Sequence, residues 1–405
     1  MAIDRRTFIT GSCMTAAAFA ELPKWAAIGP LREPGSRRAA QAADTVLVVV
    51  DMNGGNDGLN TLVPFGEPAY AAARPRIALT GSQLLRIDPK TGLHPSLANL
   101  YGYLNSGRLA IVQGVGYPRA DMSHFRSDDI WEKAVLDPET QATGWIGRTL
   151  DQLYAQNADA LHGAGLSGDV PALHGRYVTS PVVSDPGSST YPQNDPAQTA
   201  ALKTLFPPGG ALNRDYVSHV GRLALTDADA IQTALANYQP AVAYPKDSGL
   251  ANGLSLTVAV IAADLGPRVF WIVQGGYDTH GNQLGDQGTL LRELDQSLDA
   301  FYRDLVAHGH DQRVVVMTYS EFGRRVEDNG SGGTDHGTAG LMFVLGTKVR
   351  GGLFGTPPSL TELDPDGNLR FSTDFRSVYA SILANWIDAD PNPILFGNYP
   401  MLSFL

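Results

Sequence analysis

The chain has 405 residues, of which 43% are hydrophobic and 18% are charged, so it can bury a large core as one α/β domain with insertions or as two domains. Its formal net charge of -11 at pH 7 argues against nonspecific binding to nucleic acid or anionic membranes, and it suits a protein that holds divalent cations. Its single cysteine, Cys13, lies in a predicted signal sequence, which excludes disulfides, cysteine nucleophiles and thiolate metal sites from the processed chain.

Residues 1–42 have the pattern of a twin-arginine signal peptide followed by a linker. The pair Arg5-Arg6 precedes a short, mildly apolar stretch, and Ala18-Phe19-Ala20 forms a cleavage site of small residues. A second such site at Ala40-Gln41-Ala42 leaves the cleavage point open, and the alternative interpretation is a surface amphipathic start. Six basic and three acidic residues lie in this segment, so its removal would leave a net charge of about -14. We expect export by the twin-arginine machinery to the periplasm or the medium, with no membrane-spanning segment elsewhere.

The first predicted strand is the apolar run at residues 45–50, which ends in Asp51. Asn53, a pair of glycines and Asn56 follow, and glycine lets a backbone approach a ligand closely. Ligands bind beyond the carboxyl ends of strands in open α/β sheets, so Asp51 is a candidate metal ligand. Asn53 and Asn56 are candidate substrate-binding residues. The alternative is a tight turn in which Asp51 and Asn53 only cap the next helix.

A helix and a second strand come next. Leucines at helical spacing predict a helix over 94–104, and residues 109–112 form a short buried strand. Ser123 and His124, candidate catalytic residues, then lie at the start of another predicted helix, with Arg126 as a candidate substrate-binding residue. A hydroxyl at the positive end of a helix is suited to be an anionic nucleophile or to bind an anion. The alternative is that Ser123 is an ordinary N-cap.

Residues from about 157 to 266 are expected to form an irregular cap or insertion within a single domain that spans 43–405. Prolines between residues 161 and 208 forbid long helices there, and long structured loops often shape the entry to a site. The three histidines of this range are more typical of surface or loop positions than of metal ligands: His162, His174 and His219.

Regular α/β pattern returns with a buried strand at residues 269–273, after which come Asp278 and His280. Two residues apart in an extended segment, these side chains point the same way, so a carboxylate and an imidazole can bind one cation. An amphipathic helix is predicted over 290–308.

The stretch 313–337 joins another buried strand to several polar side chains. The apolar run at 314–317 has the length and composition of a parallel strand covered on both faces, and it ends near Ser320 and Glu321. Two arginines follow, and then a glycine-rich loop that carries an acid and a histidine: Arg324, Arg325, Asp335 and His336.

Four acids and two histidines therefore gather at one predicted edge of the sheet. Like charges in one place need a cation to neutralise them. Oxygen and imidazole ligands without sulfur suit zinc, manganese, magnesium or calcium, and the sequence does not select among these metals. The predicted metal ligands are Asp51, Asp278, His280, Glu321, Asp335 and His336.

Six motifs together resemble the exported bacterial DUF1501 family, a domain of unknown function. They are the twin-arginine start, D-M-N-G-G-N-D-G at Asp51, S-H-F at Ser123, G-G-Y-D-T-H at Asp278, S-E-F-G-R at Glu321 and G-T-D-H-G at Asp335. That family is in turn distantly similar to the alkaline phosphatase and sulfatase superfamily. The resemblance implies a three-layer α/β sandwich with a mostly parallel central sheet, helices on both faces, and one or two metals at its carboxyl edge.

The resemblance also implies a role for each matching residue. Asp51 matches the first metal-binding aspartate of the superfamily, and Ser123 matches its nucleophile. Asp278 and His280 are similar to the acid and histidine that bind one metal, and His336 is similar to the late histidine of the same site.

Glu321 departs from the superfamily, which usually has a tandem Asp-His at this point, and the change puts a two-metal mechanism in doubt. The expected activity is hydrolysis of a phosphate or sulfate ester of a small molecule or glycan, with Ser123 activated by a metal. Arg324, Arg325 or Arg126 would stabilise the developing charge. The alternatives are a non-catalytic secreted protein that binds a cation or a partner, and a phosphomutase-like isomerase.

Overall fold

A computed structural model describes residues 44–158, 161–166, 168–178, 180–182, 200–201, 204–206 and 212–405. The predicted signal peptide and linker at 1–42 lie outside the described residues, as does part of the predicted cap. Within the described ranges, no helix is both long enough and apolar enough to cross a membrane.

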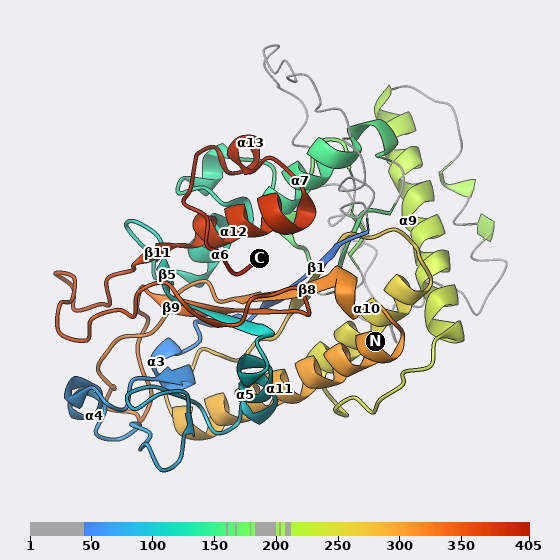
Figure 1. The fold of residues 1–405 in the computed structure, drawn as a ribbon. Coiled ribbons are helices and arrows are strands. Elements are labelled where there is room, and N and C mark those ends of the chain that lie inside the picture. Colours follow the sequence, from blue (N-terminus) through green and yellow to red (C-terminus); the bar gives the residue numbers. More distant parts are fainter. Residues whose placement is uncertain are drawn as a thin grey trace.

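A central sheet of eight strands organises the described part of the chain (Figure 1). The strands are β1 (Val46–Asp51), β5 (Leu109–Gly116), β6 (Gly163–Gly165), β7 (Val269–Val273), β8 (Val314–Tyr319), β9 (Gly340–Leu345), β10 (Gly352–Phe354) and β11 (Thr373–Asp374). Their order is β10-β5-β9-β8-β1-β7-β6, with β11 beside β5. All pairs are parallel except those of β9, so the sheet is mostly parallel, as predicted.

Both faces of the sheet are covered by helices. Successive side chains of a strand point to opposite faces, and in β1 Leu47 and Val49 join one buried apolar cluster while Val46, Val48 and Val50 join another. The first face carries α6 (His124–Lys133), α7 (Trp145–Tyr154), α12 (Phe375–Ile382) and α13 (Pro391–Leu395); the second carries α5 (Ala98–Asn105), α10 (Gly249–Ala262) and α11 (Gln283–Ala307) (Figure 1). The predicted three-layer α/β sandwich is confirmed.

Smaller elements surround this core. A three-stranded sheet in the order β2-β4-β3 lies apart from the main one, and α9 contacts α10. These elements are β2 (Leu62–Val63), β3 (Leu85–Arg86), β4 (Gly92–Leu93), α3 (Gly58–Thr61), α4 (Pro68–Ala73) and α9 (Leu212–Asn237). Short 3₁₀ turns occur at Pro138–Thr140, Ala155–Asn157, Pro171–Leu173 and Asp311–Arg313, and a π-helical turn at Leu383–Ile387.

The structure differs from the sequence-based expectation in three elements. The helix predicted over 94–104 begins only at Ala98, and the helix predicted over 290–308 begins earlier, at Gln283. The range 157–266, expected as an irregular cap, contains regular elements. Of these, β6 pairs with β7, and α10 packs against the same sheet through an almost entirely buried apolar surface.

Candidate metal centre

The carboxyl ends of three adjacent strands bring the predicted residues together. β1 lies between β7 and β8, and its last residue, Asp51, is in register with Val273 of β7 and Tyr319 of β8. The loops that follow these strands therefore start side by side. α6, which follows β5, reaches the same edge, since His124 in its first turn contacts Glu321 after β8.

Four side chains converge here, and we call His124, Asp278, His280 and His336 the imidazole cluster. Asp278 Oδ1 lies 3.0 Å from His280 Nε2 and 3.1 Å from His336 Nε2, while Asp278 Oδ2 lies 3.6 Å from His124 Nε2. The Nε2 atoms of His280 and His336 are themselves 3.1 Å apart. The Asp278 side chain is 47% exposed, so the cluster is open to solvent.

The other ring nitrogen of each histidine contacts a fixed acceptor. His124 Nδ1 lies 2.7 Å from Glu321 Oε1, and His280 Nδ1 lies 3.1 Å from Asp335 Oδ1. His336 Nδ1 lies 2.8 Å from the backbone carbonyl of Met122. Because carboxylates and carbonyls only accept, each Nδ1 must carry the hydrogen, and in a neutral ring the Nε2 atom then has a free lone pair.

The Nε2 lone pairs of His124 and His336 and an oxygen of Asp278 lie within 4.8 Å of one another and thus face a common point, and His280 Nε2 contacts Asp278 and His336 beside it. Acceptors in contact at 3.0 to 3.1 Å repel one another unless a proton or a cation lies between them. Metal-binding histidines commonly donate their second N–H to a carboxylate or a backbone carbonyl, which is the arrangement of all three rings. The imidazole cluster therefore fits a divalent cation with nitrogen and oxygen ligands.

Charge around Asp278 is set by a buried arginine. Burial raises the pKa of Asp278, but hydrogen bonds with Arg324 and His336 outweigh it and hold the pKa at about 2. The pKa of His124 is raised, chiefly by its hydrogen bond to Glu321 and against the effect of burial. A charged carboxylate is thus present at neutral pH to attract a cation.

Arg324 itself lies beneath the imidazole cluster and is 1% exposed. Its guanidinium donates to the backbone carbonyls of Gly54, Gly55, Tyr277 and Thr334 and to Asp278 Oδ1, the last at 2.7 Å. Arg324 therefore ties the loop after β1 to the loop after β7 and fixes the orientation of Asp278.

A second group of acids lies deeper, and we call Asp51, Asp128 and Glu321 the acid cluster. One oxygen of each lies within 4.8 Å of the other two. Glu321 is fully buried, and its carboxylate accepts from the backbone N–H groups of Gly54 and Gly55 and from the Ser320 hydroxyl as well as contacting His124. Glu321 is thus satisfied by protein donors and orients the His124 ring.

The other two acids are not satisfied in this way. Oδ1 of Asp51 and Oδ1 of Asp128 are buried without a hydrogen-bond partner among the described residues. Burial, with the neighbouring charge of Glu321, raises the pKa of Asp128 to about 8, and burial with Asp128 raises that of Asp51 well above its usual range. At neutral pH this pair either retains protons or shares a cation.

Ser123 is the N-cap of α6 and is exposed. Its side chain makes no capping hydrogen bond, and its backbone N–H donates to Asp121 Oδ1 at 2.8 Å. The hydroxyl and the first-turn amides of α6 are therefore not tied to each other. The following residue in the chain is His124, so the backbone of Ser123 adjoins that of one member of the imidazole cluster.

The remaining expected residues lie at varying distances from this centre. Asn53 donates to Asp128 Oδ2 at 3.1 Å, whereas Asn56 is buried and accepts from Thr61 and Gln287. Arg126 contacts three acids near the surface, and Arg325 is exposed and donates to the carbonyl of Asp366. The structure therefore brings Asn53 to the acid cluster but engages Asn56 within the core.

Two contributors to the site were not predicted from the sequence as metal ligands. His124 was expected to be catalytic rather than to join the other imidazoles, and Asp128 was not singled out. Asp128 lies four residues after His124, so the two share one face of α6. That spacing is the signal that could have found Asp128. The Met122 carbonyl is a backbone group, and no residue type could have indicated its role.

Comparison with solved structures finds only distant similarity. The chain is similar to the sulfatase PsFucS1 from Pseudoalteromonas sp., at 10% identity and a TM-score of 0.40, over 100% of this chain and 78% of that one. It is similar to an alkaline phosphatase superfamily protein from Vibrio parahaemolyticus, at 8% identity and a TM-score of 0.37, over 87% and 71%. The chain is also similar to the C-terminal periplasmic domain of EcEptC from Escherichia coli in complex with zinc, at 10% identity and a TM-score of 0.37, over 79% of this chain and 77% of that one. Similarity this low carries no information on activity.

Among curated proteins, no sequence matches the chain. A profile of the family described as "Protein of unknown function (DUF1501)" matches residues 113–364, which is more than half of the chain and includes the whole imidazole cluster. The family resemblance expected from the motifs is confirmed: the chain belongs to the DUF1501 family.

Proposed function

We propose that this protein is a periplasmic or secreted, metal-dependent hydrolase of phosphate or sulfate esters that uses Ser123 as its nucleophile. The observation that carries the proposal is the convergence of three Nε2 atoms on Asp278, with every Nδ1 anchored to an acceptor. Export through the predicted twin-arginine signal is part of the same proposal.

The imidazole cluster would hold the cation through Asp278 and the Nε2 atoms of His124 and His336, with His280 as a further ligand. Among zinc, manganese, magnesium and calcium, such a ligand set favours zinc or manganese, since calcium and magnesium prefer all-oxygen sites. Bound there, the cation would supply Lewis-acid chemistry that lowers the pKa of a hydroxyl and stabilises negative charge. Asp335 and Glu321 were first expected as ligands. Instead, Asp335 would orient His280, and Glu321 would orient His124.

Asp51 remains a proposed ligand at a separate position. Its unpartnered oxygen and that of Asp128 would suit a hard cation, which prefers oxygen ligands. Glu321 would contribute charge to this position while its oxygens stay bonded to backbone amides. The single-metal chemistry at the imidazole cluster does not depend on this second position.

Ser123 is the group best placed to attack an ester. In the proposed step Ser123 Oγ loses its proton to solvent and forms a bond to phosphorus or sulfur, and the bond to the ester oxygen breaks. The electron pair stays on the leaving oxygen, which takes a proton from solvent through the open site. The uncapped amides of the first turn of α6 would bind the oxygens of the transferred group. Water then attacks the same centre and releases a proton, and Ser123 Oγ leaves and takes up a proton to restore its hydroxyl.

One observation favours the non-catalytic alternative, a secreted cation-binding protein. Two of the arginines expected to bind the transferred group are already engaged by protein groups. Arg324 donates to backbone carbonyls and to Asp278, and Arg126 pairs with surface acids. Under the catalytic proposal, Arg324 is a positioning residue for Asp278, and charge stabilisation falls to the cation and the helix amides.

Turnover of aryl phosphates and aryl sulfates by metal-loaded protein tests the proposal. Ser123→Ala is expected to lower kcat/KM by about a thousandfold or more, because the nucleophile is lost, while the bound metal stays unchanged. Ser82 is an exposed serine outside the proposed site, so Ser82→Ala is the matched control and is expected to keep full turnover. Equal turnover by wild type and Ser123→Ala would contradict the role of Ser123. If no ester is turned over while chelation lowers the melting temperature, the non-catalytic alternative is supported.

A further inference from the structure

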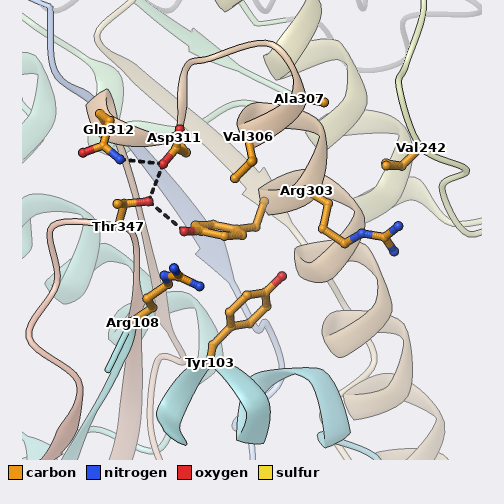
Figure 2. Close-up of a pocket in the computed structure, with 10 residues that line it drawn as sticks. Tyr103, Arg108, Val242, Arg303, Val306, Ala307, Asp311, Gln312 and Thr347 are labelled. Atoms are coloured by element: carbon orange, nitrogen blue, oxygen red, sulfur yellow. Dashed lines mark hydrogen bonds between the residues drawn. The ribbon is translucent and has the colours of Figure 1, made fainter. Parts of the chain in front are cut away.

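A cavity of about 560 Å³ opens at the edge of the sheet opposite the imidazole cluster. Arg108 immediately precedes β5, Asp311 and Gln312 precede β8, and Thr347 follows the antiparallel β9, so these residues mark the amino-terminal edge of the parallel strands. Figure 2 shows the lining side chains, half of which come from α5 and α11. The cavity is therefore separate from the site described above.

One wall of the cavity is a fixed polar network. Asp311 Oδ2 accepts from Thr347 Oγ1 at 2.7 Å and from Gln312 Nε2 at 2.8 Å, and the Thr347 hydroxyl also contacts the Tyr302 hydroxyl at 2.7 Å (Figure 2). Oδ2 of Asp311 is thus engaged by two neutral donors. Among the described residues, Asp311 forms no ion pair with the arginines of the cavity.

Tyr302 connects this network to an aromatic wall of the cavity, which carries an arginine without an acceptor. The rings of Tyr103 and Tyr302 meet edge to face with centroids 4.9 Å apart, and the Arg108 guanidinium lies 6.0 Å from the Tyr302 ring. Among the described residues, Arg108 has no carboxylate partner and its side chain has no hydrogen-bond acceptor. Arg303, by contrast, pairs with Asp299 at 3.4 Å. Arg108 is exposed, so its guanidinium is open to a ligand that enters the cavity beside the aromatic rings.

We propose that this cavity binds a small planar organic anion, an aromatic carboxylate in the simplest case. Its volume falls in the range of small-molecule sites, roughly 300 to 1,000 Å³. The planar guanidinium of Arg108 matches a carboxylate with two parallel hydrogen bonds, and the tyrosine rings contact the body of the ligand. This site is independent of the proposed ester hydrolysis.

Fluorine NMR with para-fluorobenzoate tests the proposal on the whole chain, in the presence of a chelator that keeps metal out of the imidazole cluster. Wild type is expected to bind this anion saturably, and para-fluorobenzamide, its neutral isostere, at least about tenfold more weakly. Arg108→Gln weakens binding of the anion by about tenfold or more. The matched control is Arg176→Gln, because Arg176 is an exposed arginine 5.4 Å from the Tyr177 ring but outside the cavity.

A second variant tests the place of binding without changing charge. Val306 lines the cavity and is 49% exposed, so Val306→Trp would fill the space and block the ligand while its folding is checked by thermal melting. Loss of binding in this variant and in Arg108→Gln, with binding kept in Arg176→Gln, supports the site. The proposal is overturned if wild type shows no saturable binding at about 1 mM probe, if the amide binds as well as the acid, or if the Arg176 variant loses as much as the Arg108 variant.

Discussion

The rings of the imidazole cluster are oriented by groups that do not themselves face the common point. Each Nδ1 contacts a different acceptor: a buried glutamate, an exposed aspartate and a backbone carbonyl. Sequence patterns predicted Asp278, His280 and His336 as ligands, because acids and histidines after strands are a recognisable signal. They could not predict the Met122 carbonyl, which depends on the path of the chain before α6, or the saturation of Glu321 by backbone amides.

Removal of one orienting acceptor should weaken cation binding without removing a ligand. Asp335→Ala leaves the His280 Nδ1–H without its carboxylate, and we expect a loss of about 10- to 100-fold in zinc affinity, measured by competition with a chromophoric chelator. Asp335→Asn, which keeps an oxygen acceptor, should recover part of this loss. Asp366→Ala removes an exposed acid from another loop and is the charge control. Equal affinity in Asp335→Ala and the control would show that Asp335 does not orient His280.

A buried histidine away from the site predicts how stability depends on pH. His94 Nδ1 accepts from the Ser96 N–H at 3.1 Å, so the ring is neutral, and burial followed by the charge of Arg292 lowers its pKa from 6.5 to about 4. As pH falls, His94 binds a proton in the unfolded chain at a higher pH than in the folded chain. The stability from neutral His94 is therefore fully present above pH 6.5 and is lost as pH falls toward 4. The loss amounts to about 3 kcal/mol.

Urea unfolding of wild type and His94→Gln, in the presence of a chelator, measures this contribution. The difference in unfolding free energy between the two proteins should shrink by about 3 kcal/mol between pH 7 and pH 4. A difference that stays constant with pH would mean that the pKa of His94 is not lowered in the native state.

Among the elements, the strands were predicted more accurately than the helix boundaries. β1, β7 and β8 are buried on both faces, so each is a continuous apolar run that the sequence reveals directly. α11 begins at Gln283, about two turns before its predicted start at 290, because its first turns bury polar side chains. Gln283 and Gln287 donate hydrogen bonds to Asp57 and Asn56, respectively, in the loop after β1. The spacing of apolar residues cannot indicate a helical turn whose buried side chains are polar.

The loops after β1 and β7 approach so closely that one glycine is required between them. Gly54 has a φ of +119°, and a Cβ there would lie 2.4 Å from the backbone nitrogen of Asp278. Gly54→Ala is therefore expected to destabilise the fold by more than about 1 kcal/mol and to weaken zinc binding, since Asp278 must shift.

Gly102→Ala is the control for this substitution. Gly102 lies in α5 with nothing within 4 Å of an added Cβ, so alanine there should stabilise the protein by about 0.5–1 kcal/mol. Urea unfolding and zinc titration of both variants check the pair. A Gly54→Ala protein with wild-type stability and affinity would mean that the two loops are not packed as described.

For the whole molecule, the order of elements was enough to predict the layered α/β architecture. Buried strands that alternate with amphipathic helices favour a mostly parallel sheet with helices on both faces, and this is the arrangement found. The role of residues 157–266 could not be derived in the same way. β6 has only three residues, too few for a periodic signal, and it lies in a stretch rich in proline and glycine. α10 is apolar on nearly every side, so its sequence pattern does not show the helical periodicity of an amphipathic helix.

The position of a bound cation tests the central claim most directly. Crystals of the full protein grown with zinc, with diffraction data collected on both sides of the zinc absorption edge, would locate the ion by its anomalous signal. We predict that the strongest peak lies between Asp278 and the Nε2 atoms of His124, His280 and His336, and that it disappears in His336→Asn crystals. A zinc-loaded crystal with no peak at this point, or with its strongest peak unchanged by His336→Asn, would contradict the assignment of the imidazole cluster as a metal centre.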